Sequence, residues 1–366
     1  MKTIPIAEKF ITVKILFLSF FLLLTVMSCK KSRDDTPSPA SAKVYIAGSS
    51  RISTTQYFPA YWLNSVRTDL TVPAPSLHGE AYSMAVSGTD VYTVGRYNNG
   101  TINIPCYWKN GIRNDLSTID NTKNAVAYSI AVSGADIYVA GFSVNSSDVV
   151  APCYWKNGIR TNLTPIAVTK FALATSVYIA GTDVYVTGRS TNLVDETVAC
   201  YWKNGIRTEL PPITNSELAV ATSVYVSGTD IYISGRSLNT SDISVPCYWK
   251  NGTRIDLSKI DNLKHGYGES IFISGADVYV AGYTTNAALK LIPCYWKNGT
   301  RTDLSIIDNN QSGIARSVYV SGVDIYVGGT TISAAGTEIP CYWKNGIRTD
   351  LNAGVAGQAN FILISN

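Results

Sequence analysis

One phrase, PCYWKNGIRTDL, recurs through the sequence and constrains the fold more than any other feature. It reads in full at 340–351, and similar copies stand at 59–70, 105–116, 152–163, 199–210, 246–257 and 293–304. The step from Trp62 to Trp108 is 46 residues, and each later step between the tryptophans of successive copies is 47. A fixed period of this length is typical of repeat architectures, in which each unit buries its apolar face against its neighbours.

Each repeat contains two predicted hairpins. In the unit that begins at Ala221, the β-branched and aromatic runs 224–226 and 231–233 flank a Ser-Gly-Thr-Asp turn. The later runs CYWK and TRIDL flank Asn251 and Gly252, two residues that tolerate the positive φ of a type I′ turn. Four antiparallel strands per unit follow, and no stretch after the first 28 residues shows helical periodicity.

Seven units of four strands predict an all-β, seven-bladed β-propeller over residues 43–366. The chain ends support a closed ring. Six copies of the first hairpin are whole, whereas the seventh is divided: 359–365 fit its first strand and 43–48 its second. We therefore expect the C-terminal strand to pair with the N-terminal strand. In a linear solenoid the two ends of the chain would lie apart, and a hairpin divided between them could not form.

The run VSGTDIYISG at 226–235, followed by an aromatic hairpin, resembles the kelch repeat, and Gly328 with Gly329 keeps the double glycine of that repeat. The units are also similar to extracellular HAF-type repeats, which end in an aromatic, Trp, Asn-Gly, Leu pattern. The kelch resemblance implies that the first strand of each blade is innermost. It implies no activity, because kelch propellers include both binding modules and oxidases.

Cysteine usage and charge exclude several classes of function. Six of the seven cysteines occupy the same position of successive repeats: Cys106, Cys153, Cys200, Cys247, Cys294 and Cys341. Equivalent points on neighbouring repeats lie beyond the roughly 4.4–6.8 Å that a disulfide spans, so we predict free, buried thiols. The sequence contains no Cys/His cluster with the spacing of a metal site, and we expect no cofactor. A net charge of +4 does not indicate the strongly basic surface with which proteins bind nucleic acid.

The N-terminus is typical of an export signal. Residues 1–28 have a basic start, an apolar run at 15–27 and Ser28, with an uncleaved anchor as the alternative. The VMSC stretch at 26–29 resembles a bacterial lipobox, which implies lipidation of Cys29. Residues 29–42 are polar and rich in Ser and Pro, as in a disordered tether.

The residues of the predicted tether indicate where in the cell the protein is located. By the same resemblance, Lys30 after the cysteine implies release to the outer membrane. Asp34 and Asp35 are similar to surface-export signals of Bacteroidetes lipoproteins. We therefore expect a lipid-anchored outer-membrane protein, with cell-surface or periplasmic facing left open.

Residues that repeat in every unit are interpreted as scaffold. Strand alternation predicts Cys247 and Trp249 on one face and Tyr248 on the other, as packing between blades requires. The aspartate of each tight turn, such as Asp230, is expected to bond nearby backbone groups, with an acidic ring as the alternative. The outer arginines, such as Arg254, are expected to pair with an acidic residue two places on.

Residues that differ between units are the functional candidates. One variable position lies just before the first strand of each blade, on the face of the disc that bears the long loops: Tyr82, Tyr128, Thr175, Thr222, Glu269, Arg316 and Asn360. A serine follows it in six of the seven units. With the first strand innermost, this set surrounds the mouth of the central channel. Arg96, Arg189 and Arg236 end second strands nearby, and His78 and His265 fall in adjoining loops, each near a glutamate.

The predicted ligand-binding set is Tyr82, Tyr128, Glu269, Arg316, Asn360, Arg96, Arg189, Arg236 and His265, and no residue is predicted to be catalytic. Aromatic, hydroxyl, carboxylate and guanidinium groups together suit a sugar or an anionic small molecule. The alternative is a solvated rim without a ligand.

Three functions are compatible with the sequence. The first is a monomeric, non-catalytic binding module of the cell envelope, with a glycan or an envelope protein as partner. The second is an envelope glycosidase or lyase, for which His265, Glu269 and Arg316 form the one cluster suited to acid-base work. The third is a structural subunit of an outer-membrane assembly.

Overall fold

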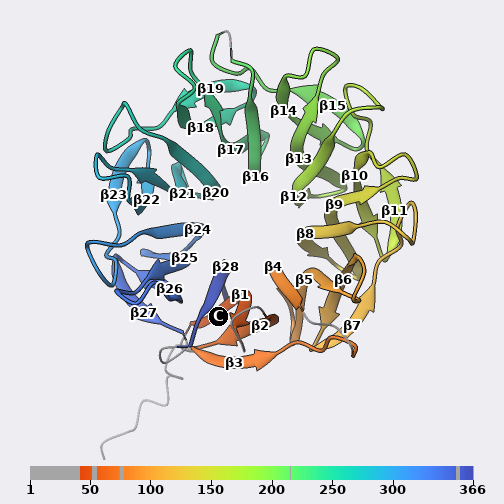
Figure 1. Ribbon diagram of the computed structural model, residues 1–366, viewed down its shortest axis with the longest axis horizontal. Helices are drawn as coiled ribbons and strands as arrows, with labels where there is room; N and C mark the ends of the chain where they lie inside the picture. The colour runs from red at the N-terminus through yellow and green to blue at the C-terminus, as the bar shows by residue number, and fades with distance from the viewer. Residues whose placement is uncertain (1–41, 52–55, 75–77, 215, 352–354, 366) are drawn as a thin grey trace, which may run out of the picture. The chain divides into compact units, whose positions relative to one another are not determined.

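The computed structural model describes residues 42–51, 56–74, 78–214, 216–351 and 355–365, which form 28 strands in seven four-stranded sheets (Figure 1). The predicted seven-bladed β-propeller is confirmed. The predicted signal peptide, Cys29 and all but the last residue of the predicted tether lie outside the described residues. Within those ranges, no helix has the length and apolarity needed to cross a bilayer.

Six blades follow one another along the chain, and each is an antiparallel sheet whose strands lie in sequence order. Blade 2 has β4 (His78–Ser87), β5 (Asp90–Asn98), β6 (Asn103–Lys109) and β7 (Ile112–Asp115). Blade 3 has β8 (Ala125–Ser133), β9 (Asp136–Val144), β10 (Val150–Lys156) and β11 (Ile159–Asn162). Blade 4 has β12 (Ala172–Ala180), β13 (Asp183–Thr191), β14 (Thr197–Lys203) and β15 (Ile206–Glu209).

The remaining whole blades repeat this order. Blade 5 has β16 (Ala219–Ser227), β17 (Asp230–Leu238), β18 (Ser244–Lys250) and β19 (Thr253–Asp256). Blade 6 has β20 (Gly266–Ser274), β21 (Asp277–Thr285), β22 (Leu291–Lys297) and β23 (Thr300–Asp303). Blade 7 has β24 (Gly313–Ser321), β25 (Asp324–Ile332), β26 (Glu338–Lys344) and β27 (Ile347–Asp350).

Blade 1 is assembled from both ends of the described chain. Its strands, from the channel outward, are β28 (Gly357–Ser365), β1 (Lys43–Arg51), β2 (Tyr57–Leu63) and β3 (Val66–Asp69). β28 pairs antiparallel with β1, from Lys43 opposite Ser365 to Ser50 opposite Gly357. The predicted closure of the ring is confirmed.

The first strand of each blade is innermost, as the kelch resemblance implied. β4, β8, β12, β16, β20, β24 and β28 contact one another in order and surround the central channel (Figure 1). Side chains that vary at the loop-side end of these strands therefore meet at one channel mouth.

Packing between blades uses the two faces of the third strand as predicted. Cys247 and Trp249 pack into a core with Tyr185 and Leu210 of the preceding blade. Tyr248 packs toward the next blade. All seven tryptophans are fully buried, and burial of each contributes on the order of 4–6 kcal/mol by apolar area. The six cysteines of the repeats are free and buried, as predicted.

The tight turns differ from expectation in one respect. The Asp230 carboxylate accepts from the Asn251 amide at 2.8 Å and pairs with the Lys250 ammonium at 2.9 Å, so its partners are side chains rather than backbone groups. Asn251 makes the backbone bond instead, accepting from Ile231 N at 2.9 Å. The predicted outer pairs are present, for example Arg254 with Asp256 at 2.6 Å.

Candidate functional site

A β-bulge marks the variable position of every inner strand. In blade 2, Ala81 pairs with Gly95 and Ser83 pairs with Val94, so Tyr82 has no partner across the strands. The register shifts in the same way at the other six variable positions, which are Tyr128, Thr175, Thr222, Glu269, Arg316 and Asn360. Bulges redirect side chains, and these seven turn theirs to the channel mouth.

A glycine in the second strand makes each bulge sterically feasible. A Cβ atom on Gly235 would lie 2.0 Å from the carbonyl oxygen of Val220, which is backbone and cannot move aside. The equivalent glycines stand equally close to an inner-strand carbonyl: Gly48, Gly95, Gly141, Gly188, Gly282 and Gly329. This glycine of each second strand is therefore required by the bulge opposite.

The bulged residues and five of the six serines that follow them line a cavity of about 120 Å³. A second pocket of about 270 Å³ shares Tyr128, Thr175, Thr222 and Glu269 with it and adds Leu173 and Arg189. We call these two connected spaces the cup. The sequence-derived position of the site at the channel mouth therefore coincides with a hollow in the structure.

Several polar groups of the cup bond to the neighbouring blade. Asn360 Nδ2 donates to Ala81 O at 2.9 Å, and Thr222 Oγ1 donates to Gly268 O at 2.8 Å. Ser129 Oγ accepts from Val177 N at 3.1 Å, and Ser176, Ser270 and Ser317 make the same contact with the blade that follows each. Asn360 and most of the serine ring thus hold blades together.

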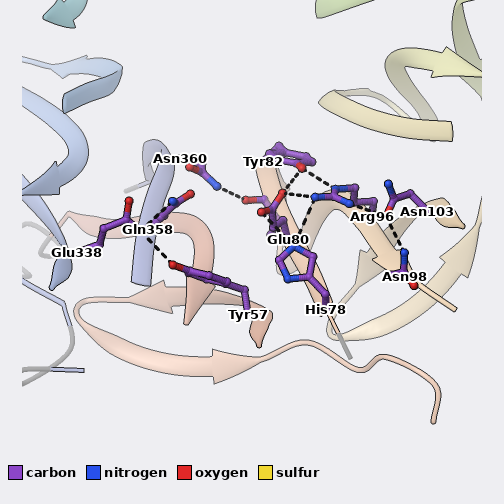
Figure 2. A network of polar contacts seen from close by, with 11 residues as sticks. Tyr57, His78, Glu80, Tyr82, Arg96, Asn98, Asn103, Glu338, Gln358 and Asn360 are labelled. Atoms are coloured by element: carbon purple, nitrogen blue, oxygen red, sulfur yellow. Dashed lines mark hydrogen bonds and ion pairs between the residues drawn. The ribbon is translucent and has the colours of Figure 1, made fainter. Parts of the chain in front are cut away.

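In blade 2, Tyr82 and Arg96 belong to a closed polar network around Glu80 (Figure 2). Arg96 donates from Nε to the Tyr82 hydroxyl at 2.9 Å and from Nη2 to Glu80 Oε2 at 3.1 Å. Tyr82 donates to Glu80, and His78 Nε2 lies 3.3 Å from Glu80 Oε1. Burial alone would raise the pKa of Glu80, but the His78 hydrogen bond, the Arg96 charge and the Tyr82 hydrogen bond lower it to about 2.

Four other charged side chains of the predicted set have no such partner. Within the described residues, Arg189, Arg236, Arg316 and Glu269 form neither hydrogen bonds nor ion pairs, and Arg316 Nε is buried. Burial raises the pKa of Glu269, against the opposing charges of Arg316 and Arg236. Burial and the nearby charge of Arg236 lower the pKa of Arg189. These four groups therefore act on one another electrostatically and have no partner among the described residues.

Aromatic rings border the cup on both sides. Tyr128 lies 5.3 Å from Tyr82 and 6.0 Å from Phe142, between ring centroids. Tyr267 stacks on Tyr283 at 4.6 Å. The sequence-derived set omits Phe142, Tyr267, Tyr283 and Glu80. Phe142 and Tyr283 follow the second-strand glycine just as Arg96 does, so comparison of that position between units could have found them.

The structure does not bring His265 to Glu269. His265 Nδ1 accepts from Ser244 N at 3.1 Å, and its ring centroid lies 6.4 Å from that of Tyr267. Among the described residues His265 makes no contact with the Glu269 carboxylate. The predicted acid-base cluster of His265, Glu269 and Arg316 is thus reduced to its last two members.

Beyond the serine ring, the channel continues into a cavity of about 200 Å³. Four consecutive blades line it with Tyr178, Tyr225, Phe272 and Tyr319, whose ring centroids follow one another at 4.9, 5.1 and 4.6 Å. Ala131 lines the side of blade 3. Across the described ranges, no group of three or more His, Cys, Asp or Glu side chains is placed to hold a metal ion.

The fold and the site define a seven-bladed β-propeller with a charged, aromatic cup at the loop-side mouth of its channel. No protein-family model matches the sequence, and no curated protein does. The kelch-like and HAF-type resemblance therefore stays a prediction.

Solved structures are similar to this chain at low sequence identity. A Mycobacterium tuberculosis puromycin-hydrolyzing peptidase has a TM-score of 0.52 at 10% identity, over 87% of this chain and 54% of that one. A triple arginine-to-alanine mutant of AofleA from Arthrobotrys oligospora has a TM-score of 0.44 at 10% identity, over 78% and 88% of the two chains. A subtype N11 neuraminidase-like protein of the A/flat-faced bat/Peru strain has a TM-score of 0.41 at 9% identity, over 76% and 87%. At such identities the peptidase similarity concerns the fold alone.

Proposed function

We propose that the protein is a non-catalytic binding module whose ligand occupies the cup. The observation that carries this proposal is the unsatisfied pair at blades 6 and 7. Arg316 Nε is buried without a partner, and Glu269 beside it has none among the described residues. An unmade hydrogen bond at a buried polar group costs about 1–3 kcal/mol, so a ligand that supplies the partners accounts for their retention.

The remaining acid-base groups support binding rather than turnover. Glu80 is fixed by Arg96, Tyr82 and His78, and its low pKa keeps it ionised. Glycoside hydrolysis uses two carboxyl groups about 5–9.5 Å apart, one of which must donate a proton. Glu269, with its raised pKa, could be that donor, but His265 is bonded to Ser244 instead of assisting it.

A binding screen tests the proposal. Purified full-length protein in detergent is titrated with a panel of saccharides and metabolites by calorimetry, beside the double variant Glu269→Ala/Arg316→Ala. The matched control is Arg301→Ala/Asp303→Ala, which removes one charge of each sign from the outer edge of blade 6, where the two pair at 2.8 Å. We expect at least one ligand whose affinity falls more than about ten-fold in the first variant and is unchanged in the control.

Two results would contradict the proposal. Absence of any binding, with an intact circular dichroism spectrum, would exclude the small-ligand module and direct the search to protein partners. Conversion of a bound ligand to product, lost in Glu269→Ala, would replace the binding module by the enzyme.

We further propose that the module is tethered to the outer membrane through a lipid on Cys29, on the strength of the lipobox-like VMSC stretch. Labelling with radioactive palmitate and fractionation of membranes test this part. Incorporation of label and membrane association are expected in the parent protein and not in Cys29→Ala. Equal membrane association of both proteins without label would favour an uncleaved anchor.

A further inference from the structure

We infer that the ligand of the cup is an acidic saccharide, a single sugar ring bearing a carboxylate, sulfate or phosphate group that Arg189, Arg236 and Arg316 bind. This inference rests on the proposed function and names its ligand class. It is carried by the contrast between these three arginines, which lie around one hollow, and the seven arginines elsewhere that pair with a carboxylate.

Seven arginines elsewhere in the fold have carboxylate partners, whereas Arg160 on the outer strand of blade 3, where Asn162 replaces the acidic residue, has none among the described residues. Arg96 donates to Glu80 at 3.1 Å, and the outer-strand Arg301 pairs with Asp303 at 2.8 Å. The three cup arginines have no hydrogen bond or ion pair with any described residue. Guanidinium groups stay charged in proteins, so their donors require an acceptor from outside the described chain.

The three guanidinium groups come from separate blades and converge. Arg189 and Glu269 line one pocket of the cup, and Glu269 and Arg316 line the other. Arg236 lines neither pocket but holds in β17 the position that Arg189 holds in β13 of the preceding blade, and its charge acts on both Arg189 and Glu269. Three positive groups thus face one carboxylate, which leaves an excess of positive charge. Like charges held together without a counterion disfavour one another, and a bound anion removes that penalty.

Aromatic contacts orient two of these arginines without using their donors. The Arg236 guanidinium lies 4.6 Å from the centroid of the Tyr267 ring, and the Arg189 guanidinium lies 5.4 Å from that of Phe171. Such stacking fixes the planar group while its N–H bonds remain available. A fixed fork of donors suits the paired oxygens of a carboxylate, sulfate or phosphate.

The remaining walls fit a sugar ring. Tyr128 lines the same pocket as Arg189, and its ring belongs to the row formed with Tyr82 and Phe142. The C–H face of a sugar packs on such a ring, whose edge stays polar. The two spaces of the cup, of about 270 and 120 Å³, together reach only the lower end of the range of about 300–1,000 Å³ typical of drug-sized ligands, which suits one sugar ring.

Matched pairs of sugars test the inference by calorimetry on the full-length protein. The pairs are glucose with glucuronate, galactose with galacturonate, N-acetylglucosamine with its 6-sulfate, and glucose with glucose 6-phosphate; inorganic sulfate is the ring-free probe. We expect an acidic member to bind at least about ten-fold tighter than its neutral partner, with an affinity that falls as salt rises. Arg189→Gln and Arg236→Gln should each reduce that affinity by about ten-fold or more, whereas the matched Arg301→Gln should leave it unchanged.

The outcomes separate this inference from the proposed function. Equal affinity for neutral and acidic members would overturn the anionic ligand and leave the binding module standing. If Arg189→Gln and Arg236→Gln both bind the acidic sugars as tightly as the parent protein does, the role of the arginines would be overturned. Inorganic sulfate binding as tightly as the acidic sugars would overturn the sugar ring. If no member of this panel or of the wider screen binds, the proposed function itself fails.

Discussion

The glycine of each second strand allows the neighbouring inner strand to bulge, and the bulge in turn directs one side chain into the cup. Gly235 faces the Val220 carbonyl, and Thr222 is the residue that the bulge turns toward the channel. A single conformational requirement therefore links a glycine that is common to all seven units to a residue that differs between them. The common residue maintains the geometry, and the variable one is left to determine the chemistry.

Replacement of this glycine should be severe. We expect Gly235→Ala to lower the free energy of unfolding by about 3 kcal/mol or more, because its Cβ would overlap a backbone oxygen. Gly228→Ala in the same blade is the control. Its φ of +58° strains an alanine, but nothing lies near its Cβ, so we expect a loss of about 1–2 kcal/mol. Urea unfolding curves compare the two, and equal losses would contradict the steric role assigned to Gly235.

Glu269, which lines the cup, and Glu80, which bonds to the cup residue Tyr82, should respond to pH in opposite directions. The pKa of Glu80 is lowered from its ordinary value of 4.5 to about 2. The ionised Glu80 therefore stabilises the folded protein above pH 4.5, and this stabilisation is lost as the pH falls toward 2. Glu80→Gln should therefore cost about 2–3 kcal/mol at neutral pH, a gap that narrows below pH 4.5.

Glu269 has a raised pKa, so the folded state binds its proton more tightly than the unfolded state does, and stability falls as pH rises above 4.5. Glu269→Gln should stabilise the protein at neutral pH and match the parent in acid. Denaturant unfolding across this pH range distinguishes the two cases. A destabilised Glu269→Gln at neutral pH would indicate that the carboxylate is paired after all.

At the scale of single elements, the inner strand of each blade is both a wall of the channel and a connector. In four blades its serine accepts a backbone N–H from the next inner strand, as Ser129 does from Val177. Its bulged residue often reaches the same neighbour, as Thr175 Oγ1 does in bonding to Ala221 O at 2.9 Å. Side-chain hydrogen bonds thereby join the inner strands at six of the seven junctions between blades, although the strands belong to different sheets. Between blades 2 and 3 the described contact is that of the Tyr82 and Tyr128 rings.

Loss of one serine contact should be measurable. We expect Ser129→Ala to lower the free energy of unfolding by about 1–2 kcal/mol, because Val177 N would be left without its acceptor. Ser223→Ala is the matched control, since Ser223 holds the same position in its blade and its hydroxyl forms no hydrogen bond with a residue that the structure describes. Thermal unfolding of the two variants should differ, and a similar loss in both would assign the effect to packing.

The sequence is sufficient to predict the strands and turns but not the bulges. Asn251 and Gly252 give the outer turn, and both have positive φ, at 51° and 81°. The unpaired position of Glu269 depends on register with the second strand, which local patterns do not specify. The pairing of Arg96 with Glu80 and the lack of a partner for Arg189 were likewise not predictable. Each depends on which side chains meet across strands, whereas in the sequence these arginines occupy equivalent positions.

At the scale of the whole propeller, the divided blade determines how the ring is closed. β28 and β1 meet in antiparallel register with Lys43 opposite Ser365. In blade 5 the equivalent pair, Ser227 and Asp230, is joined by the two residues Gly228 and Thr229. Blade 1 thus makes without a covalent turn the same sheet that the other blades make with one.

A circular permutant tests this equivalence. Ser365 is joined to Lys43 through Gly-Thr, residues 1–42 are omitted, and new ends are opened between Thr240 and Ser241, which are exposed in a loop of blade 5. We expect a monomeric ring whose free energy of unfolding lies within about 1 kcal/mol of the parent, because loop-closure terms of this size are small. Size-exclusion chromatography and urea unfolding report the result. Deletion of 356–366 instead should leave the edge of β1 open and give an aggregating product.

The same division bears on how such a chain changes over generations. DNA that encodes near-identical copies can misalign during recombination, and an unequal exchange then removes or adds one whole period. Each period carries a full set of four strands, so an exchange among the uninterrupted blades leaves the pairing of β28 with β1 intact. Ring circumference can thus change by one blade per event. Because each copy brings its own bulged residue, every such event also adds or removes one side chain at the rim of the cup.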